Sequence, residues 1–122
     1  MPVSQIWTPD IVLYNYADTR LEEKREVLAV VSSDGKVRWR PSCIYKSTCQ
    51  INIQNFPYDH QNCHMKFGSW TYDGDSIDIQ FLDKPEINRE LFLTSNEWDV
   101  ISTEGRRNEK KYECCKEYFP DM

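Results

Sequence analysis

The sequence predicts an all-β protein in which short antiparallel strands pack as a β-sandwich. Apolar or alternating runs of strand length recur along the 122 residues and are separated by turn residues, which is typical of antiparallel β-proteins. The pair Asp34-Gly35 divides two such runs, as expected for a tight hairpin turn. We find no convincing amphipathic helix, internal repeat or linker, so residues 1–122 are interpreted as part of one domain.

Seven segments are expected to form strands. Ile77, Ile79 and Phe81 alternate with polar residues, which indicates a half-buried strand. The segments are 27–31, 37–47, 50–54, 64–71, 76–82, 97–103 and 110–114. Residues 83–96 are polar and contain Pro85, so we expect a long surface loop there. The chain starts abruptly at a Trp-x-Pro-Asp motif and ends after Phe-Pro-Asp, so the sandwich is expected to be incomplete.

Composition argues against several classes of function. The net charge of −5 and the pI near 5.0 disfavour nucleic-acid binding, which needs a basic surface. No run of 18 apolar residues is present, so no membrane span is expected in this chain. The first ten residues lack the basic and apolar regions of a signal peptide. We find no Ser-His-Asp arrangement, phosphate-binding loop or catalytic Cys-His pair, so neither enzymatic activity nor a cofactor is expected.

The five cysteines indicate an oxidising compartment, because two are adjacent and two form a spaced pair. The missing signal peptide fits that compartment if the chain is part of a longer secreted or membrane protein. Cys49 and Cys63 enclose 13 residues, and a disulfide between them would stabilise the fold by roughly 3 kcal/mol. Cys43 has no obvious partner and is expected to be a buried free thiol.

The segment around Cys63 allows a second interpretation. His60, Cys63 and His64 cluster in the sequence and are an alternative to a simple disulfide loop, but they lack the paired spacings of zinc sites, so no metal is expected. Within the same segment an aromatic residue precedes a proline at Phe56-Pro57, which favours a cis peptide bond.

Cys49 and Cys63, with Phe56-Pro57-Tyr58-Asp59 between them, resemble the signature loop of the Cys-loop family of pentameric ligand-gated ion channels. In that family the loop lies at the membrane end of the extracellular domain and passes the binding signal to the pore helices. The resemblance gives this contact role to Phe56, Pro57 and Asp59.

Three further motifs resemble ligand-binding loops A, B and C of nicotinic acetylcholine receptor alpha-type subunits. They are Trp7-x-Pro9-Asp10-x-x-x-Tyr14-Asn15, Gly68-Ser69-Trp70-Thr71-Tyr72-Asp73-Gly74, and Tyr112-x-Cys114-Cys115 followed by Tyr118-Phe119-Pro120-Asp121. The resemblance runs from Ile6 to Asp121. It implies an immunoglobulin-like antiparallel β-sandwich from which the first strands of the ligand-binding domain are missing. Trp7 and Trp98 are interpreted as core or turn aromatics.

The resemblance implies an aromatic ligand site. A quaternary ammonium has no N–H to donate, but aromatic faces attract it by roughly 0.5–2 kcal/mol per contact. Trp70 would be the central ring, with Tyr14 and Tyr112 as walls. Phe119 aligns with the second tyrosine of loop C and lacks its hydroxyl; Tyr118 is the alternative if the loop shifts by one residue. A Cys114–Cys115 disulfide is implied at the tip of loop C, the alternatives being two thiols or separate partners.

Other residues are assigned supporting roles by the resemblance. Asp10 would hydrogen-bond the loop B backbone near Thr71. Lys66, Tyr112 and Asp121 would form a trio that links loop C closure to gating, although exposed ion pairs usually contribute less than about 1 kcal/mol. Three residues, Val30, Arg38 and Arg40, fall on strands that resemble loop E of the complementary face. The two arginines would repel a cation there, which favours a heteromeric receptor.

The resemblance therefore implies binding of acetylcholine or nicotinic agonists through the principal face of an inter-subunit site. In a full-length pentamer with other subunits, the protein would gate a cation channel at the extracellular, postsynaptic face of the plasma membrane. The alternatives are a soluble acetylcholine-binding protein without a channel and a truncated, non-signalling receptor fragment. The Phe-Pro-Tyr-Asp sequence favours the channel.

Overall fold

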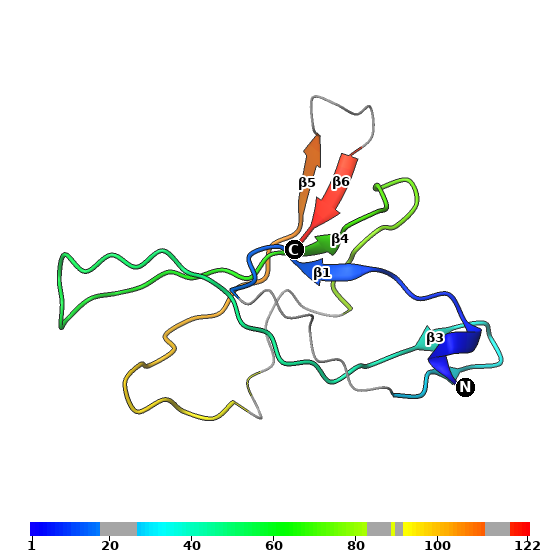
Figure 1. Cartoon of the computed structure of the whole chain (residues 1–122), viewed down its shortest axis with the longest axis horizontal. Coiled ribbons are helices and arrows are strands. Elements are labelled where there is room, and N and C mark those ends of the chain that lie inside the picture. Colours follow the sequence, from blue (N-terminus) through cyan, green and yellow to red (C-terminus); the bar gives the residue numbers. More distant parts are fainter. Residues whose placement is uncertain (18–26, 83–88, 90–91, 112–117) are drawn as a thin grey trace.

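The computed structural model describes residues 1–17, 27–82, 89, 92–111 and 118–122. Within these ranges the chain is all-β apart from one short 3-10 helix, η1 (Val3–Gln5). Four strands form an antiparallel sheet in the order β1 (Ile11–Leu13), β4 (Phe67–Ser69), β6 (Tyr118–Asp121) and β5 (Asn108–Lys111). Strands β2 (Val30–Val31) and β3 (Val37–Arg38) form a separate hairpin (Figure 1). The expected all-β, antiparallel class is confirmed.

Strand β4 connects the two halves of the larger sheet. It pairs with β1 from Ile11↔Ser69 to Leu13↔Phe67, but it pairs with β6 at a single position, Gly68↔Asp121. Two backbone hydrogen bonds between Phe67 and Met122, of 2.7 and 2.9 Å, close this contact. The β5–β6 hairpin therefore joins the rest of the sheet around Asp121.

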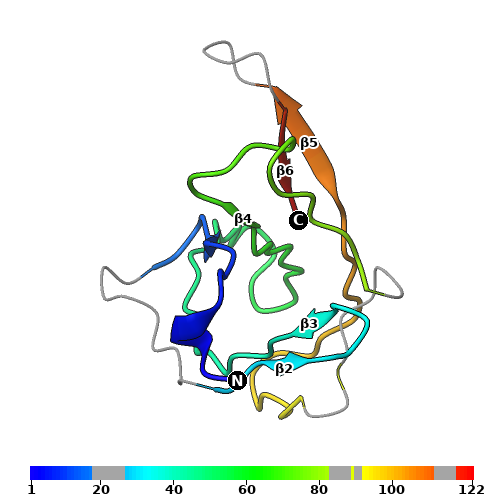
Figure 2. The same ribbon diagram turned by 90° about the vertical axis from the view of Figure 1, so that its right-hand side faces the viewer.

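The predicted turn at Asp34-Gly35 is confirmed. The amide of Ser32 donates to the carbonyl of Lys36 at 2.9 Å, and Gly35 has a φ of 87°, a conformation that side-chain-bearing residues rarely adopt. The flanking strands are shorter than the predicted segments 27–31 and 37–47. Figure 2 shows this hairpin at the opposite end of the molecule from β5 and β6.

Three predicted strands, 50–54, 76–82 and 97–103, are not strands in the structure, and 64–71 is reduced to β4. In segment 50–54 the backbone of Asn52 is paired with a side chain instead of a neighbouring strand. The side chain of Gln61 accepts from the Asn52 amide at 3.0 Å and donates to the Asn52 carbonyl at 2.7 Å. Residues 110–111 of the last predicted segment lie in β5, and 112–114 lie outside the described residues.

Segment 76–82 shows why alternation is an incomplete guide. Ile77, Ile79 and Phe81 are half-buried and the residues between them are exposed, as predicted, yet no strand in the described part of the chain pairs with them. The Arg107 side chain makes the connection instead, with Nε donating to the Ile79 carbonyl at 2.6 Å and an ion pair to Asp78 at 2.6 Å. Alternation thus predicted the buried face but not the backbone pairing.

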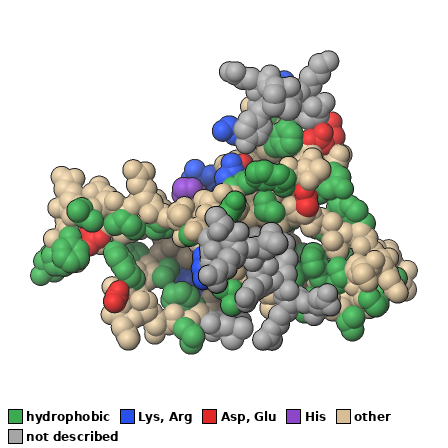
Figure 3. All heavy atoms as spheres, viewed as in Figure 1, with side chains coloured by type: hydrophobic (Ala, Val, Ile, Leu, Met, Phe, Trp, Pro, Cys, Tyr) green, Lys and Arg blue, Asp and Glu red, His purple; other side chains and the backbone are tan. Residues whose placement is uncertain are grey.

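The described core is small. Leu13 and Ala29 are its buried apolar residues, and many large apolar side chains are exposed, as the green surface in Figure 3 shows. Trp7 and Trp98 were interpreted as core or turn aromatics, and the core alternative is wrong, because 62% and 48% of their surfaces are exposed. Two polar residues, Ser69 and Asp121, are buried where β1, β4 and β6 meet.

The Cys49–Cys63 disulfide is present, with the two Cα atoms 5.4 Å apart, and the Phe56–Pro57 bond is cis, as predicted. The loop projects from the sheet as two long arms (Figure 1) and exposes Phe56 and Tyr58 near its tip. Because the sulfur of Cys63 is in the disulfide, it is not available to a metal. Cys43 is a free thiol but is half-buried rather than buried, since it lies on the irregular segment after β3.

The described residues contain no cluster of His, Cys, Asp and Glu side chains suited to a metal ion. The same residues include no helix with the length and apolar character needed to cross a membrane.

Candidate functional site

Two aromatic rings meet at the junction of β1 and β4. Tyr14 directly follows β1, and its hydroxyl donates to the carbonyl of Ser69 at 2.5 Å. Trp70 directly follows β4, and its ring centroid lies 6.1 Å from that of Tyr14, with the planes tilted by 48°. The Trp70 side chain stays open, with 73% of the residue exposed. The sheet therefore presents an accessible indole beside an anchored phenol.

Gly68 makes room for the Tyr14 ring. A Cβ atom at this position would lie 2.7 Å from Cε2 of Tyr14 and 2.9 Å from its hydroxyl oxygen. Such distances are far below a van der Waals contact, so any larger residue at 68 would displace the ring.

Asp10 anchors the segment that carries Trp70. Its carboxylate accepts the Ser69 hydroxyl at 2.5 Å and the Thr71 amide at 2.8 Å, so the expected contact with the Thr71 backbone is present. The Ser69 hydroxyl oxygen also accepts the Tyr72 amide at 2.9 Å. Desolvation raises the pKa of Asp10, but the hydrogen bonds from Ser69 and Thr71 outweigh it and hold this pKa below its usual value. The carboxylate is thus charged at neutral pH.

A second contact joins the same two chain segments. The indole Nε1 of Trp7 donates to the Tyr72 hydroxyl at 3.4 Å, and the two rings meet edge to face at 5.9 Å. Trp7 therefore supports Tyr72, which follows Trp70 by two residues.

Lys66 and Asp121 lie next to the aromatic pair. Their ion pair measures 2.7 Å, and the Lys66 ammonium also lies 5.4 Å from the centroid of the Tyr14 ring. The other carboxylate oxygen of Asp121 accepts the side-chain amide of Asn108 at 3.0 Å. The third expected member of the trio, Tyr112, lies outside the described residues.

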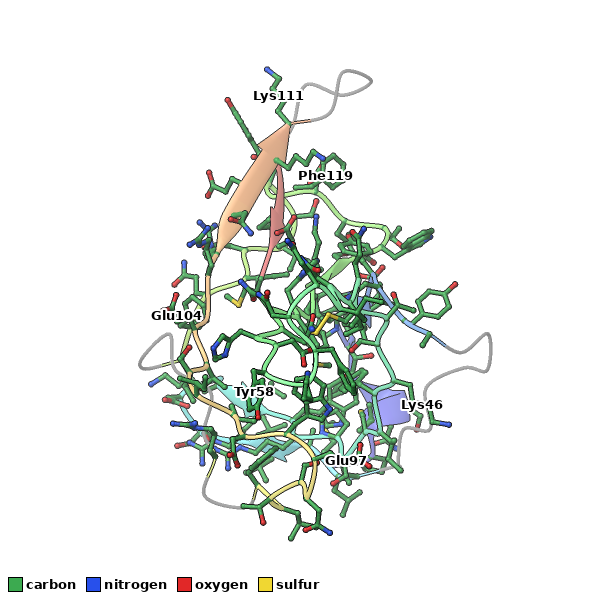
Figure 4. The ribbon with its side chains drawn as sticks, turned by 90° about the vertical axis from the view of Figure 1, so that its left-hand side faces the viewer. Lys46, Tyr58, Glu97, Glu104, Lys111 and Phe119 are labelled. Atoms are coloured by element: carbon green, nitrogen blue, oxygen red, sulfur yellow. A yellow bond between two sulfur atoms is a disulfide. The ribbon has the colours of Figure 1, made fainter. Side chains whose placement is uncertain are left out.

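The register of β5 and β6 separates Phe119 from Tyr118. Phe119 is two residues from Asp121 on one strand, so the two side chains share a face of the sheet. Tyr118 lies on the opposite face, where its cross-strand partner Lys111 places an ammonium 5.5 Å from the ring centroid. Figure 4 shows Phe119 and Lys111 on this hairpin. Phe119 is the one that shares a face with the Asp121–Lys66 pair.

Not all predicted site residues come together. Phe56, Pro57 and Asp59 lie on the Cys49–Cys63 loop, where Asp59 accepts from the Gln61 side chain, and Figure 4 shows Tyr58 of that loop away from Phe119. The residues compared with loop E, namely Val30, Arg38 and Arg40, lie on or just after the β2–β3 hairpin. Cys114 and Cys115, like Tyr112, lie outside the described residues.

Sequence reasoning gave no role to three residues that hold the site together: Ser69, Asn15 and Asn108. Asn15 accepts the Lys66 amide at 3.0 Å and donates to the His64 carbonyl at 2.7 Å, which fixes the chain leading into β4. Ser69 and Asn15 lie inside the motifs quoted above. Their short polar side chains, adjacent to Trp70 and Tyr14, are the sequence feature that could have identified them. Nothing in the sequence singles out Asn108, because its role depends on the strand register.

Comparison with known proteins gives one family. The model of the neurotransmitter-gated ion-channel ligand binding domain matches residues 1–122. The neuronal acetylcholine receptor subunit alpha-2 of Gallus gallus is 47% identical over 122 residues, covering 100% of this chain and 23% of that subunit. The acetylcholine receptor subunit alpha-like of Manduca sexta is 45% identical over 130 residues, and the match covers 100% of this chain and 25% of the Manduca sexta subunit.

A solved structure also matches. The acetylcholine-binding protein (AChBP) from Bulinus truncatus superposes with a TM-score of 0.77 at 33% identity, covering 99% of this chain and 59% of that chain. This similarity confirms the predicted β-sandwich fold.

Proposed function

Since this chain belongs to the neurotransmitter-gated ion-channel ligand binding domain family, we propose that it binds acetylcholine through the principal face of an inter-subunit aromatic site. The family is a receptor domain and not an enzyme. The observation that carries the proposal is the exposed Trp70 ring held beside Tyr14 by the Asp10 and Ser69 hydrogen bonds.

The chemistry of the ligand accounts for these residues. The quaternary ammonium of acetylcholine binds aromatic faces, with roughly 0.5–2 kcal/mol per ring and the largest share from tryptophan. Trp70, Tyr14 and Phe119 are proposed as three rings of the site. The Tyr118 ring is less suitable, because it lies on the face of β6 opposite to Phe119 and Asp121. Tyr112 and a Cys114–Cys115 disulfide are proposed to complete the site from loop C.

The positive charge of Lys66 does not exclude a cationic ligand. Its ammonium is 2.7 Å from the Asp121 carboxylate, which neutralises it, while the net charge of the whole chain is −5. An acidic protein also attracts cations at long range.

The chain spans about a quarter of the length of the receptor subunits it matches. For the whole protein we propose a subunit that forms a pentamer with other subunits and gates a cation channel at the extracellular, postsynaptic membrane face. The exposed apolar tip of the Cys49–Cys63 loop, with Ile53 and Phe56 at 74% and 75% exposure, supports contact with a further apolar element.

A soluble acetylcholine-binding protein without a channel is the second candidate, and a truncated, non-signalling fragment the third. The structural similarity to AChBP favours the second, but identity is higher to the receptor subunits, at 47% against 33%.

The test is a chimera in which residues 1–122 replace the matching 122 residues of the chicken alpha-2 subunit, expressed with the partner subunits of that receptor. Trp70→Ala should lower acetylcholine affinity at least tenfold, roughly 1.4 kcal/mol, because the central ring is lost. Trp98→Ala, which removes another exposed indole, is the matched control and should leave affinity unchanged. A loss below tenfold for Trp70→Ala would contradict the aromatic site.

A further inference from the structure

Asn15, the second residue after β1, lies at the base of the Cys49–Cys63 loop. Its side-chain amide donates to the carbonyl of Thr48 at 3.3 Å and to the carbonyl of His64 at 2.7 Å. Thr48 directly precedes Cys49, and His64 directly follows Cys63. One amide group therefore bridges the two residues that stand just outside the disulfide, and it uses both of its donors to do so.

The remaining polar atoms of Asn15 contact the same two arms of the loop. Its side-chain oxygen accepts the Lys66 amide at 3.0 Å, and its main-chain carbonyl accepts the Thr48 amide at 2.9 Å. The next residue continues this contact, because Tyr16 forms an antiparallel bridge with Ser47. The chain that leaves β1 is thus inserted between residues 46–48 and residues 64–66, which we call the neck of the loop (Figure 1).

The disulfide and Asn15 act on different parts of the neck. The disulfide joins the two arms to each other, with the Cα atoms of Cys49 and Cys63 5.4 Å apart, and it does not involve β1. Asn15 joins both arms to the end of β1. The residue before it, Tyr14, carries one ring of the proposed site. A single peptide unit therefore separates that ring from the contact with the neck.

We propose that Asn15 is a positioning residue that clamps the neck of the Cys49–Cys63 loop to the end of β1. This inference rests on the proposed function and adds a coupling residue to it. Because Tyr14 and Asn15 are consecutive, a displacement of the Tyr14 backbone moves both arms of the loop together. Without the two donors of Asn15, the arms are tied to each other but less firmly to the ligand site.

The clamp also favours the disulfide, because a closed neck keeps the two reduced cysteines near each other and raises their effective concentration. Asn15→Asp retains the acceptor for the Lys66 amide and removes both donors. Asn15→Leu removes the donors without adding a charge. Each variant should lower the equilibrium constant for disulfide formation about five- to thirtyfold, which corresponds to the loss of one or two net hydrogen bonds.

The chimera described above, recovered from the cell surface, is equilibrated in glutathione buffers. Two glutathione molecules reduce the disulfide to two thiols and leave as one glutathione disulfide. After alkylation, trypsin releases residues 47–66 as one peptide, which lies between Lys46 and Lys66 and contains both cysteines, so its mass gives the oxidised fraction. Asn96→Asp, the same substitution at an exposed position outside the neck, should leave the equilibrium unchanged. Constants within about twofold of the parent for either Asn15 variant would overturn the inference.

Single-channel recording in saturating acetylcholine tests the coupling, because differences in affinity then have no effect. The opening equilibrium should fall at least about fivefold in both Asn15 variants and stay unchanged in Asn96→Asp. Unchanged opening in the Asn15 variants would overturn the coupling role, since Asn15 would then be a structural contact only. A parent chimera that acetylcholine fails to open would instead refute the proposed function, and the disulfide equilibrium would still decide whether Asn15 clamps the neck.

Discussion

Replacing Gly68 by alanine tests whether the Tyr14 ring is positioned by β4. The added Cβ would lie 2.7 Å from Cε2 of Tyr14, so the ring must move. Gly68 does not have a positive φ, so alanine introduces no backbone strain, and the effect is confined to the ring.

The magnitude follows from the contacts that the ring would lose. The hydrogen bond from the Tyr14 hydroxyl to the Ser69 carbonyl contributes about 0.5–1.5 kcal/mol. The contact with the Trp70 ring contributes a similar amount. Together they give about 1–3 kcal/mol, so the acetylcholine affinity of the chimeric receptor should fall roughly five- to 150-fold.

Two comparisons decide the interpretation. In a receptor that already carries Tyr14→Ala, Gly68→Ala should have no further effect, because the group it displaces is gone. Gly35→Ala is the matched control, since it strains the β2–β3 turn at φ 87° and should lower stability without changing affinity. An affinity for Gly68→Ala within twofold of the parent, or a full effect in the absence of the Tyr14 ring, would refute the reasoning.

Two further predictions concern stability of the chain. The pKa of Asp10 is below its usual value in the folded protein, so its stabilising contribution is complete above the ordinary pKa and is lost as pH falls through the lowered one. Asp10→Asn should therefore lower the free energy of unfolding at pH 7, and its difference from the parent should shrink below about pH 4. Urea unfolding at several pH values checks this, and a difference that stays constant with pH would argue against the Asp10 anchor. Replacing both Cys49 and Cys63 by serine should lower the free energy of unfolding by roughly 3 kcal/mol, measured by urea unfolding against Cys43→Ser, and a loss no larger than that of the control would contradict the stabilising role of the disulfide.

Local sequence signals predicted those features that depend on few residues. The turn at Asp34-Gly35, the Cys49–Cys63 disulfide and the cis bond before Pro57 were all predicted correctly, because each follows from the chemistry of adjacent or paired residues. The loop A contact between Asp10 and the Thr71 backbone was expected from the resemblance and is present.

Features that depend on pairing between distant strands were not predictable. Segment 76–82 alternates as a strand does, yet Arg107 contacts it with a side chain rather than a ladder. Strand β6 contains Pro120, which lacks a backbone donor, and a sequence argument would not place a strand there. The role of Asn108 follows only from its register opposite Asp121. Segments 50–54 and 97–103 also fail to form strands, and almost all of their residues are exposed, so their sequence pattern did not correspond to a buried face either.

Two main-chain atoms on either side of Trp70 bear the supporting contacts. Tyr14 holds the carbonyl of Ser69, and Asp10 holds the amide of Thr71. Neither of these two hydrogen bonds involves the side chain of residue 70, so a substitution there removes the ring contact with Tyr14 but leaves both main-chain contacts in place. If Trp70 lines the proposed site, a mutational library that varies residue 70 alone should change ligand preference while the contacts of Asp10 and Tyr14 with the main chain are kept.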